Sequence, residues 1–167
     1  MKALYTQHSK LTPQYIDKKL NDFLIEDHAE NDLTTRFTLL NKPSIATAKI
    51  VVEQNLIFVG IDIIKRIFNG ADINILVSEG TRCVPGDVVA TIMGECQLLL
   101  SRERVLLNLL QRLSGVATLT NQYVTQLNSS TIKILDTRKT TPGLRLFEKH
   151  AVAVGGGYNH RLDLEDG

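Results

Sequence analysis

The chain has 167 residues and a formal net charge of +1, with 43% hydrophobic and 22% charged residues. These values suit a globular protein of one domain or two small ones. The near-neutral balance excludes a nucleic-acid binder that depends on broad electrostatic attraction, and the absence of tryptophan argues against base-stacking surfaces.

No targeting or membrane segment is evident. The first fourteen residues lack the apolar stretch of a secretory signal, and no apolar run approaches the ~20 residues that span a bilayer. The two cysteines, Cys83 and Cys96, have neither C-x-x-C spacing nor a histidine beside them. We therefore expect a cytoplasmic protein with free cysteines, no membrane partner and no metal-ligand cluster.

The first part of the chain predicts a mixture of helices and strands. Thr12 and Pro13 are the N-cap and first residue of an amphipathic helix, and the acidic, polar stretch 26–35 reads as a loop. A short helix is expected over Asp62–Phe68. Strands are expected at Ala46–Val52, Ile73–Val77 and Val88–Met93, and Ile57–Gly60 is a further short, apolar segment. Because the order lacks regular βαβ alternation, this part predicts an α+β domain.

The second part changes to a helical period. From Ser101 an apolar stripe predicts a helix, which Ser114-Gly115 interrupts and Val116–Leu127 continues. Ile132–Leu135 then predicts a short strand, and Pro142–Val154 a helix. A strand, a loop and a helix in this order indicate a βα unit.

Two loops beside this last helix concentrate positive charge. Only two acids, Asp136 and Glu148, lie in the span 136–161, against five Lys/Arg and two His: Arg138, Lys139, Arg145, Lys149, His150, His160 and Arg161. In parallel α/β architectures ligands bind on the loops that follow strands. The pattern therefore indicates a site for a small, multiply anionic ligand.

The residue types suit such a ligand. Arg138 offers a planar fork to a carboxylate or phosphate, Lys139 adds a compact charge, and His160-Arg161 is a second cationic pair after three glycines. From spacing alone a solvated basic loop remains an alternative. Glu103-Arg104 likewise fits a solvated pair on a helix.

The motifs around these residues resemble those of quinolinate phosphoribosyltransferase, also called carboxylating nicotinate-nucleotide pyrophosphorylase. The resemblance rests on LDTRKTTPG at 135–143 and GGGYNHRL at 155–162, and it runs collinearly from about Glu26 to Asp166. It implies an α+β N-terminal domain with a leading helix, residues 1–113. The first strands and helices of an incomplete α/β barrel would follow, residues 114–167.

The resemblance also implies an activity. Members of this family transfer a phosphoribosyl group from phosphoribosyl pyrophosphate to quinolinate with loss of CO2, giving nicotinate mononucleotide and pyrophosphate for NAD biosynthesis. By resemblance Arg138, Lys139, His160 and Arg161 line the quinolinate pocket, and Arg104 reaches it from the neighbouring subunit of a homodimer. Mg²⁺ is expected with phosphoribosyl pyrophosphate, its ligands lying outside this chain. No residue is assigned a catalytic role.

The chain is shorter than a whole enzyme of this family. After Ser114 no more than two βα units fit, at ~30 residues each. We therefore expect the quinolinate-binding half only, as a truncated gene product, one piece of a split enzyme or an engineered fragment. Alternatives are a non-catalytic dicarboxylate-binding remnant and a ModD-type paralogue associated with molybdenum. A biotinyl- or lipoyl-like carrier is disfavoured because no lysine lies between Asp87 and Arg102.

Overall fold

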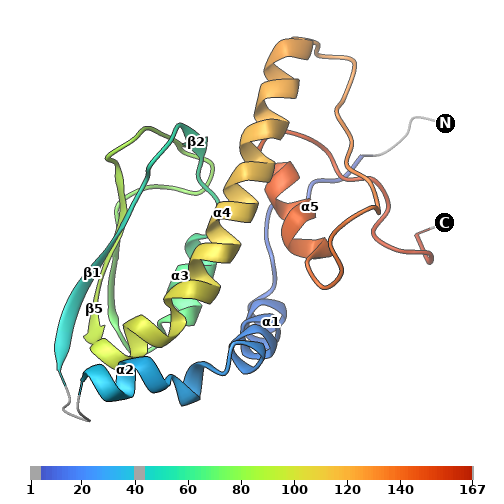
Figure 1. Cartoon of the computed structure of the whole chain (residues 1–167). Helices are drawn as coiled ribbons and strands as arrows, with labels where there is room; N and C mark the ends of the chain where they lie inside the picture. The colour runs from blue at the N-terminus through green and yellow to red at the C-terminus, as the bar shows by residue number, and fades with distance from the viewer. Residues whose placement is uncertain (1–4, 40–43, 167) are drawn as a thin grey trace.

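The structure is a computed structural model that describes residues 5–39 and 44–166 (Figure 1). Its main sheet is antiparallel, with β5 (Val88–Glu95) between β1 (Ile45–Val51) and β3 (Asp72–Ile75). A smaller antiparallel pair joins β2 (Leu56–Ile57) to β4 (Arg82–Cys83). β1, β3 and β5 fall on predicted strands, β2 shares only Ile57 with the apolar segment 57–60, and the two-residue β4 was not expected.

The helices pack around this sheet. α1 (Pro13–Glu26) and α3 (Ile61–Ile67) lie below and behind α4 (Cys96–Leu127), which crosses the molecule, and α5 (Arg145–Val154) packs against the second half of α4 (Figure 1). As predicted, Thr12 caps α1, its hydroxyl accepting a hydrogen bond from the Tyr15 amide at 3.3 Å.

One hydrophobic core joins these elements. It draws large, fully buried side chains from α1, α3, β5, α4 and α5, namely Ile16, Ile64, Ile67, Ile92, Leu106, Leu113 and Phe147. Because α4 contributes to this core over most of its length, it forms the frame on which both the sheet and α5 are positioned.

The loop predicted over 26–35 is wrong. It contains a 3-10 turn, Ala29–Asn31, and the start of α2 (Leu33–Thr38). Asp32 caps α2 by accepting from the Thr35 amide at 3.0 Å and from the Thr35 hydroxyl. Its pKa is lowered by the side-chain hydrogen bond from Thr35 and then by the Thr35 amide. The polar residues that suggested a loop are therefore capping residues.

The interruption predicted at Ser114-Gly115 is also wrong, since α4 runs unbroken through both. The Ser114 hydroxyl accepts from the Val59 amide at 3.1 Å, and this bond ties α4 to the segment that follows β2. Packing of the helix on both sides thus outweighs the ~1 kcal/mol helix penalty of one glycine. The domain boundary predicted between residues 113 and 114 falls inside this helix and stays a prediction.

Two later boundaries differ from expectation. Ile132–Leu135 is not a ladder strand; its described pairing is an isolated parallel bridge between Leu135 and Tyr158. α5 begins at Arg145, three residues after Pro142, because Gly143 adopts a φ of +82° and closes a turn with the Leu144 amide donating to the Thr141 carbonyl.

Within residues 5–39 and 44–166, no helix is both long and apolar enough to cross a bilayer. Both cysteines are free, with Cys83 buried and Cys96 half-buried. Burial raises the pKa of the Cys83 thiol, and the nearby Asp87 carboxylate adds to the effect. This thiol is therefore a packing residue rather than a nucleophile.

Candidate functional site

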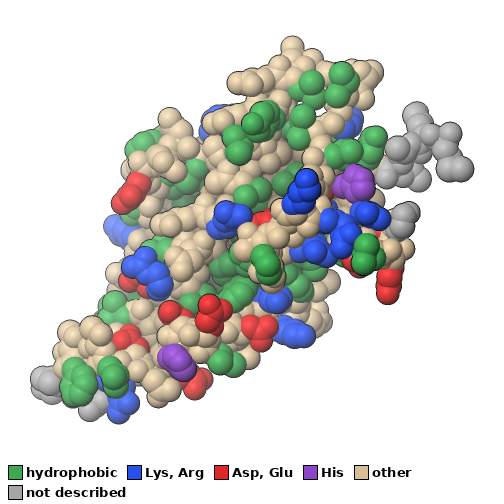
Figure 2. All heavy atoms as spheres, turned by 45° about the vertical axis from the view of Figure 1, so that its right-hand side comes forward, with side chains coloured by type: hydrophobic (Ala, Val, Ile, Leu, Met, Phe, Trp, Pro, Cys, Tyr) green, Lys and Arg blue, Asp and Glu red, His purple; other side chains and the backbone are tan. Residues whose placement is uncertain are grey.

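The structure brings the two basic loops, residues 137–143 and 155–162, to the same end of one pair of segments. Leu135 and Tyr158 form the parallel bridge, with the Tyr158 amide donating to the Ile134 carbonyl at 2.8 Å and the Asp136 amide to the Tyr158 carbonyl at 3.0 Å. Because the segments run in the same direction, both loops leave from one edge. Figure 2 shows Lys, Arg and His side chains gathered on the right-hand part of the surface.

The Asp136 carboxylate connects the two loops. One of its oxygens, Oδ1, accepts from the Lys149 ammonium and from the His160 amide, each at 2.7 Å. The other, Oδ2, accepts from the Asn159 side-chain amide at 2.7 Å. A single buried acid thereby fixes the start of the first loop against the middle of the second.

Two of the cations counted in the sequence are not available to a ligand. Lys149 is fully buried, and its ammonium also donates to the His160 carbonyl at 2.9 Å. His150 is buried and bonded to protein groups through both ring nitrogens. The local excess of free positive charge is therefore smaller than the sequence count suggested.

A second ion pair supports the first loop from α4. Arg112 donates from Nε and Nη2 to one oxygen of Glu148, at 3.1 and 2.8 Å, and also to the Thr141 hydroxyl. The other Glu148 oxygen accepts from the Thr141 amide at 3.1 Å. Burial acts to raise the pKa of Glu148, but the hydrogen bonds from Arg112 and Thr141 outweigh it and hold this pKa below its ordinary value.

The four predicted ligands on the loops have different surroundings. Lys139, His160 and Arg161 are exposed, whereas Arg138 is half-buried. The Nε of Arg138 is shielded from solvent and has no hydrogen-bond partner among the described residues. His160 Nδ1 accepts from the Arg161 amide at 2.8 Å. Nε2 is therefore the ring nitrogen that can donate to a ligand.

Arg104, the fifth predicted ligand, lies apart from the two loops. It is exposed on the first half of α4, eight residues before Arg112 and thus ~12 Å from it along the helix axis. The structure describes a single chain, so the contribution of Arg104 to a neighbouring subunit stays a prediction.

The three glycines that begin the second loop pack closely against α4. A Cβ atom at Gly157 would lie 2.9 Å from the Thr120 methyl group and 2.8 Å from Val152 Cγ1, while Gly156 has a φ of +91°. The close approach that these glycines permit is thus an approach to a helix, followed by a tight turn. Their effect on a ligand is indirect, through the placement of His160 and Arg161.

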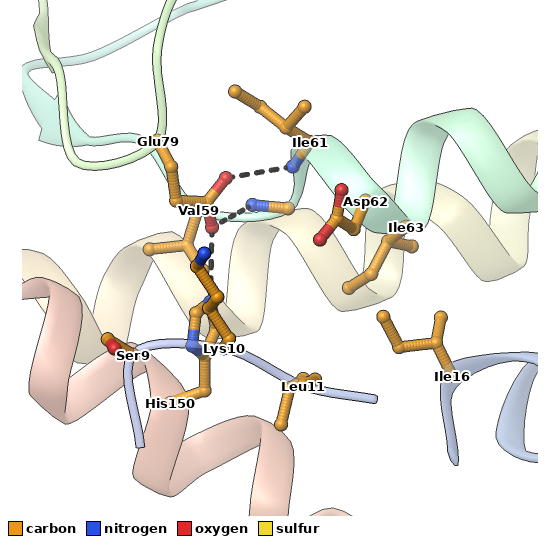
Figure 3. A pocket seen from close by; sticks show the side chains of 11 residues that line it. Ser9, Lys10, Leu11, Ile16, Val59, Ile61, Asp62, Ile63, Glu79 and His150 are labelled. Carbon is orange, nitrogen blue, oxygen red and sulfur yellow. Dashed lines mark hydrogen bonds and ion pairs between the residues drawn. The ribbon is translucent and has the colours of Figure 1, made fainter. Parts of the chain in front are cut away.

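A small cavity of roughly 200 Å³ lies where the segment before α1 passes α3 and α5 (Figure 3). The Glu79 carboxylate accepts from the amides of Gly60 and Ile61, at 2.9 and 3.0 Å, and lies 3.3 Å from His150 Nε2. His150 Nδ1 lies 2.9 Å from the His8 carbonyl. Since both ring nitrogens face acceptors, the geometry favours the doubly protonated imidazolium.

The surroundings of His150 predict that the stability of the fold depends on pH. Burial acts to lower its pKa, but the hydrogen bonds to Glu79 and His8, with the charges of Glu79 and Asp62, outweigh it and raise the pKa above the ordinary value. A raised pKa stabilises the fold fully below the unfolded value of about 6.5, and the contribution is lost as pH rises through the folded pKa. Lys10, which also lines the cavity, opposes the charge only weakly from its exposed position.

We therefore expect the melting temperature to fall as the pH is raised from 6 towards 9, and the fall to be smaller in His150→Gln. Differential scanning calorimetry in buffers of matched ionic strength measures both. Because glutamine does not titrate, an equal fall in the two proteins would contradict the assignment of this dependence to His150.

The sequence predicted the cationic side chains on the two loops but not the residues that fix the loops in place. Asp136 and Asn159 lie inside the two motifs, so the motifs were a signal for them. No local signal pointed to Thr6–His8, which contact the second loop across 150 residues of sequence. Within residues 5–39 and 44–166, no group of three or more His, Cys, Asp and Glu side chains could hold a metal ion.

Comparison with known proteins matches two family models. The model described as "Quinolinate phosphoribosyl transferase, N-terminal domain" matches residues 32–114, and the corresponding C-terminal domain model matches residues 116–167. Together the two matches take in most of the chain.

Similar proteins carry related names. A "Probable nicotinate-nucleotide pyrophosphorylase (carboxylating)" of Bacillus subtilis is 47% identical over 156 residues, covering 91% of this chain and 53% of that protein. A protein of the same name in Synechocystis is 39% identical, covering 99% of this chain and 58% of that protein. The chain thus spans about half the length of the curated relatives it matches.

Solved structures agree. The nicotinate-nucleotide pyrophosphorylase from Francisella tularensis is 33% identical with a TM-score of 0.88, over 96% of this chain and 58% of that one. NadC from Streptococcus pyogenes is 39% identical with a TM-score of 0.87, over 93% of this chain and 56% of that one. The predicted fold class is confirmed, an α+β N-terminal domain followed by the first elements of an incomplete α/β barrel.

Proposed function

Because the chain belongs to the quinolinate phosphoribosyltransferase family, we propose that it carries the quinolinate-binding half of a carboxylating nicotinate-nucleotide pyrophosphorylase. The reaction would join quinolinate to the phosphoribosyl group of phosphoribosyl pyrophosphate and release CO2 and pyrophosphate. The product would be nicotinate mononucleotide, on the route to NAD.

The observation that supports this proposal most directly is that Arg138 Nε is buried and has no hydrogen-bond partner among the described residues. A buried donor without a partner costs about 1–3 kcal/mol, and Arg138 Nε is such a donor at the edge of a loop that carries a further exposed cation. A carboxylate of the ligand would satisfy it. Quinolinate has two carboxylates, and Arg138, Lys139, His160 and Arg161 supply donors for both.

The same cations bear on the chemistry. Ribosylation makes the ring nitrogen positive, which stabilises the carbanion left when CO2 departs. The basic side chains therefore have to hold the acid in place without stabilising the departing carboxylate more in the ground state than in the transition state. Rigid placement of the loops by Asp136 and Glu148 serves this purpose, since fixed donors need no reorganisation during the reaction.

The proposal extends to partners and setting. The functional unit is a homodimer in which Arg104 of each chain enters the site of the other. Mg²⁺ enters as part of the phosphoribosyl pyrophosphate complex, and no residue of this chain is assigned to it. Free cysteines support the cytoplasm as the compartment.

Isothermal titration calorimetry with quinolinate tests the proposal. We expect binding by the parent chain and roughly 10- to 100-fold weaker binding by Arg138→Ala, which removes charge-assisted hydrogen bonds. Lys18→Ala, on the exposed face of α1, changes the net charge equally and should leave the affinity unchanged. A folded parent that does not bind quinolinate would contradict the proposal.

Mixing and turnover refine the same test. If Arg104 acts across a two-fold axis, mixed Arg104→Ala and Arg138→Ala chains regain about a quarter of the intact sites, because each heterodimer rebuilds one. Production of nicotinate mononucleotide by this chain alone would rule out a non-catalytic remnant. Quinolinate binding without turnover would instead support the remnant.

A further inference from the structure

The segment before α1 contacts the second basic loop directly. The Asn159 amide donates to the Thr6 carbonyl at 2.8 Å, the His8 amide donates to Asn159 Oδ1 at 2.6 Å, and the Gln7 side chain donates to the Gly157 carbonyl at 2.8 Å. We call Thr6–His8 the N-terminal strap. In Figure 1 this part of the chain runs past α5 before it reaches α1.

The strap makes one of three hydrogen bonds that fix the orientation of the Asn159 side chain. This side chain is 3% exposed, and its Nδ2 donates to Asp136 Oδ2 at 2.7 Å and to the Lys149 carbonyl at 2.8 Å. A flipped amide would set an acceptor against these two acceptors and a donor against the His8 N–H. The His8 N–H therefore reinforces the orientation that Asp136 and the Lys149 carbonyl also favour.

Asp136 passes this order on to the cations. Its Oδ1 accepts from the His160 amide, and Lys149, its ion-pair partner, donates to the His160 carbonyl. The backbone of His160 is thus held on both sides by groups that are themselves aligned with Asn159. Three hydrogen bonds, from His8 to Asn159, from Asn159 to Asp136 and from His160 to Asp136, connect the His8 N–H to the residue that presents the second cationic pair.

We infer that the N-terminal strap is a positioning element of the dicarboxylate site, acting through Asn159 and the Asp136–Lys149 pair on the backbone of His160 and Arg161. The inference rests on the proposed function for the nature of the ligand. Docking of the strap preorganises the second loop, so that less conformational entropy is lost when an anion binds. The strap touches neither the ligand nor the reacting atoms.

A pair of substitutions at one position tests this inference. His8→Pro removes the backbone N–H that Asn159 accepts, whereas His8→Ala keeps it, and both lose the imidazole. We expect amide hydrogen exchange over 157–162 to be about tenfold faster in His8→Pro, since one hydrogen bond to a buried group is lost, and unchanged in His8→Ala. Quinolinate affinity should weaken in parallel, in His8→Pro only.

A second variant and an internal reference keep the test decisive. Gln7→Ala removes the bond to Gly157 from an exposed side chain and should speed exchange over 157–162 about threefold, with the fold retained. Exchange of the core amides of Ile64 and Leu106 reports global stability and should not change. Equal acceleration in the core and in 157–162 would mean that the strap only stabilises the fold, and the inference would be overturned.

Different outcomes would reject the role of the strap and the proposed ligand. Faster exchange over 157–162 in His8→Pro, with no quinolinate binding by any variant, would uphold the positioning effect and reject the proposed ligand. Unchanged exchange and affinity in His8→Pro, with a parent that binds quinolinate, would reject the positioning effect and leave the proposed function standing.

Discussion

Asp136→Asn is expected to destabilise the protein by about 3–5 kcal/mol, because it leaves the buried Lys149 ammonium without its counter-charge. The Lys149 side chain is fully buried and that of Asp136 is 6% exposed, so water cannot replace the lost charge. An asparagine also turns one of the two acceptor oxygens into a donor, which then faces the donor groups of Asn159 or of Lys149 and His160. Chemical denaturation followed by circular dichroism measures the change.

Matched variants separate this effect from the general loss of a salt bridge. Asp17→Asn removes a pair of the same length, 2.7 Å to Arg66, but with side chains 57% and 30% exposed, and should cost no more than about 1 kcal/mol. The double variant Asp136→Asn/Lys149→Met should lose less stability than the two single changes added together, since the unpaired charge is gone. Equal losses in Asp17→Asn and Asp136→Asn would show that Lys149 is not effectively buried.

Gly155→Ala should cost about 3 kcal/mol, because the added methyl group has no room against α4. Its Cβ would lie 2.8 Å from Thr120 Cβ and would overlap the Ala117 carbonyl oxygen, a backbone atom inside the helix. The φ of Gly155 is −70°, which alanine adopts without strain. The loss is therefore a packing effect, and thermal unfolding of the purified variant measures it.

Gly115→Ala is the control for this prediction. Gly115 lies in α4 with its side exposed, and no described atom outside its own helix would come within 4 Å of a Cβ. Alanine there should stabilise the protein by about 0.8–1 kcal/mol through helix propensity. We expect opposite signs for the two changes in stability, and a Gly155→Ala variant as stable as the parent would refute the close packing.

The two basic loops are held in place by residues of α4 and α5. α4 and α5 hold the first loop through Arg112 and Glu148, and α5 holds the second through Lys149. The exposed cations on the loops have few bonds of their own. Substitutions in the support should therefore affect stability first, whereas Arg138→Ala should affect ligand affinity.

Much of the local structure could be predicted from the sequence because it depends on near neighbours. The cap at Thr12 and the period of the apolar residues in α1 and α4 are of this kind. The loop predicted over 26–35 was wrong for a local reason, the capping of α2 by Asp32, whereas two other errors arose where a distant contact decided the outcome. Ser114 stays helical because its hydroxyl bonds to the Val59 amide. Ile132–Leu135 does not form a ladder because, among the described residues, it pairs only through the isolated bridge from Leu135 to Tyr158.

The sequence by itself determined which chemistry the site offers, since the residue types and spacing of the two motifs point to a small polyanion and to one enzyme family. Only the tertiary structure decided which cations remain free. It places Lys149 and His150 inside, paired with Asp136 and Glu79, and gives Arg138 Nε no partner among the residues that the structure describes. The reason is that burial and pairing depend on residues from 13 to 150 positions away in sequence, and no local pattern records those separations.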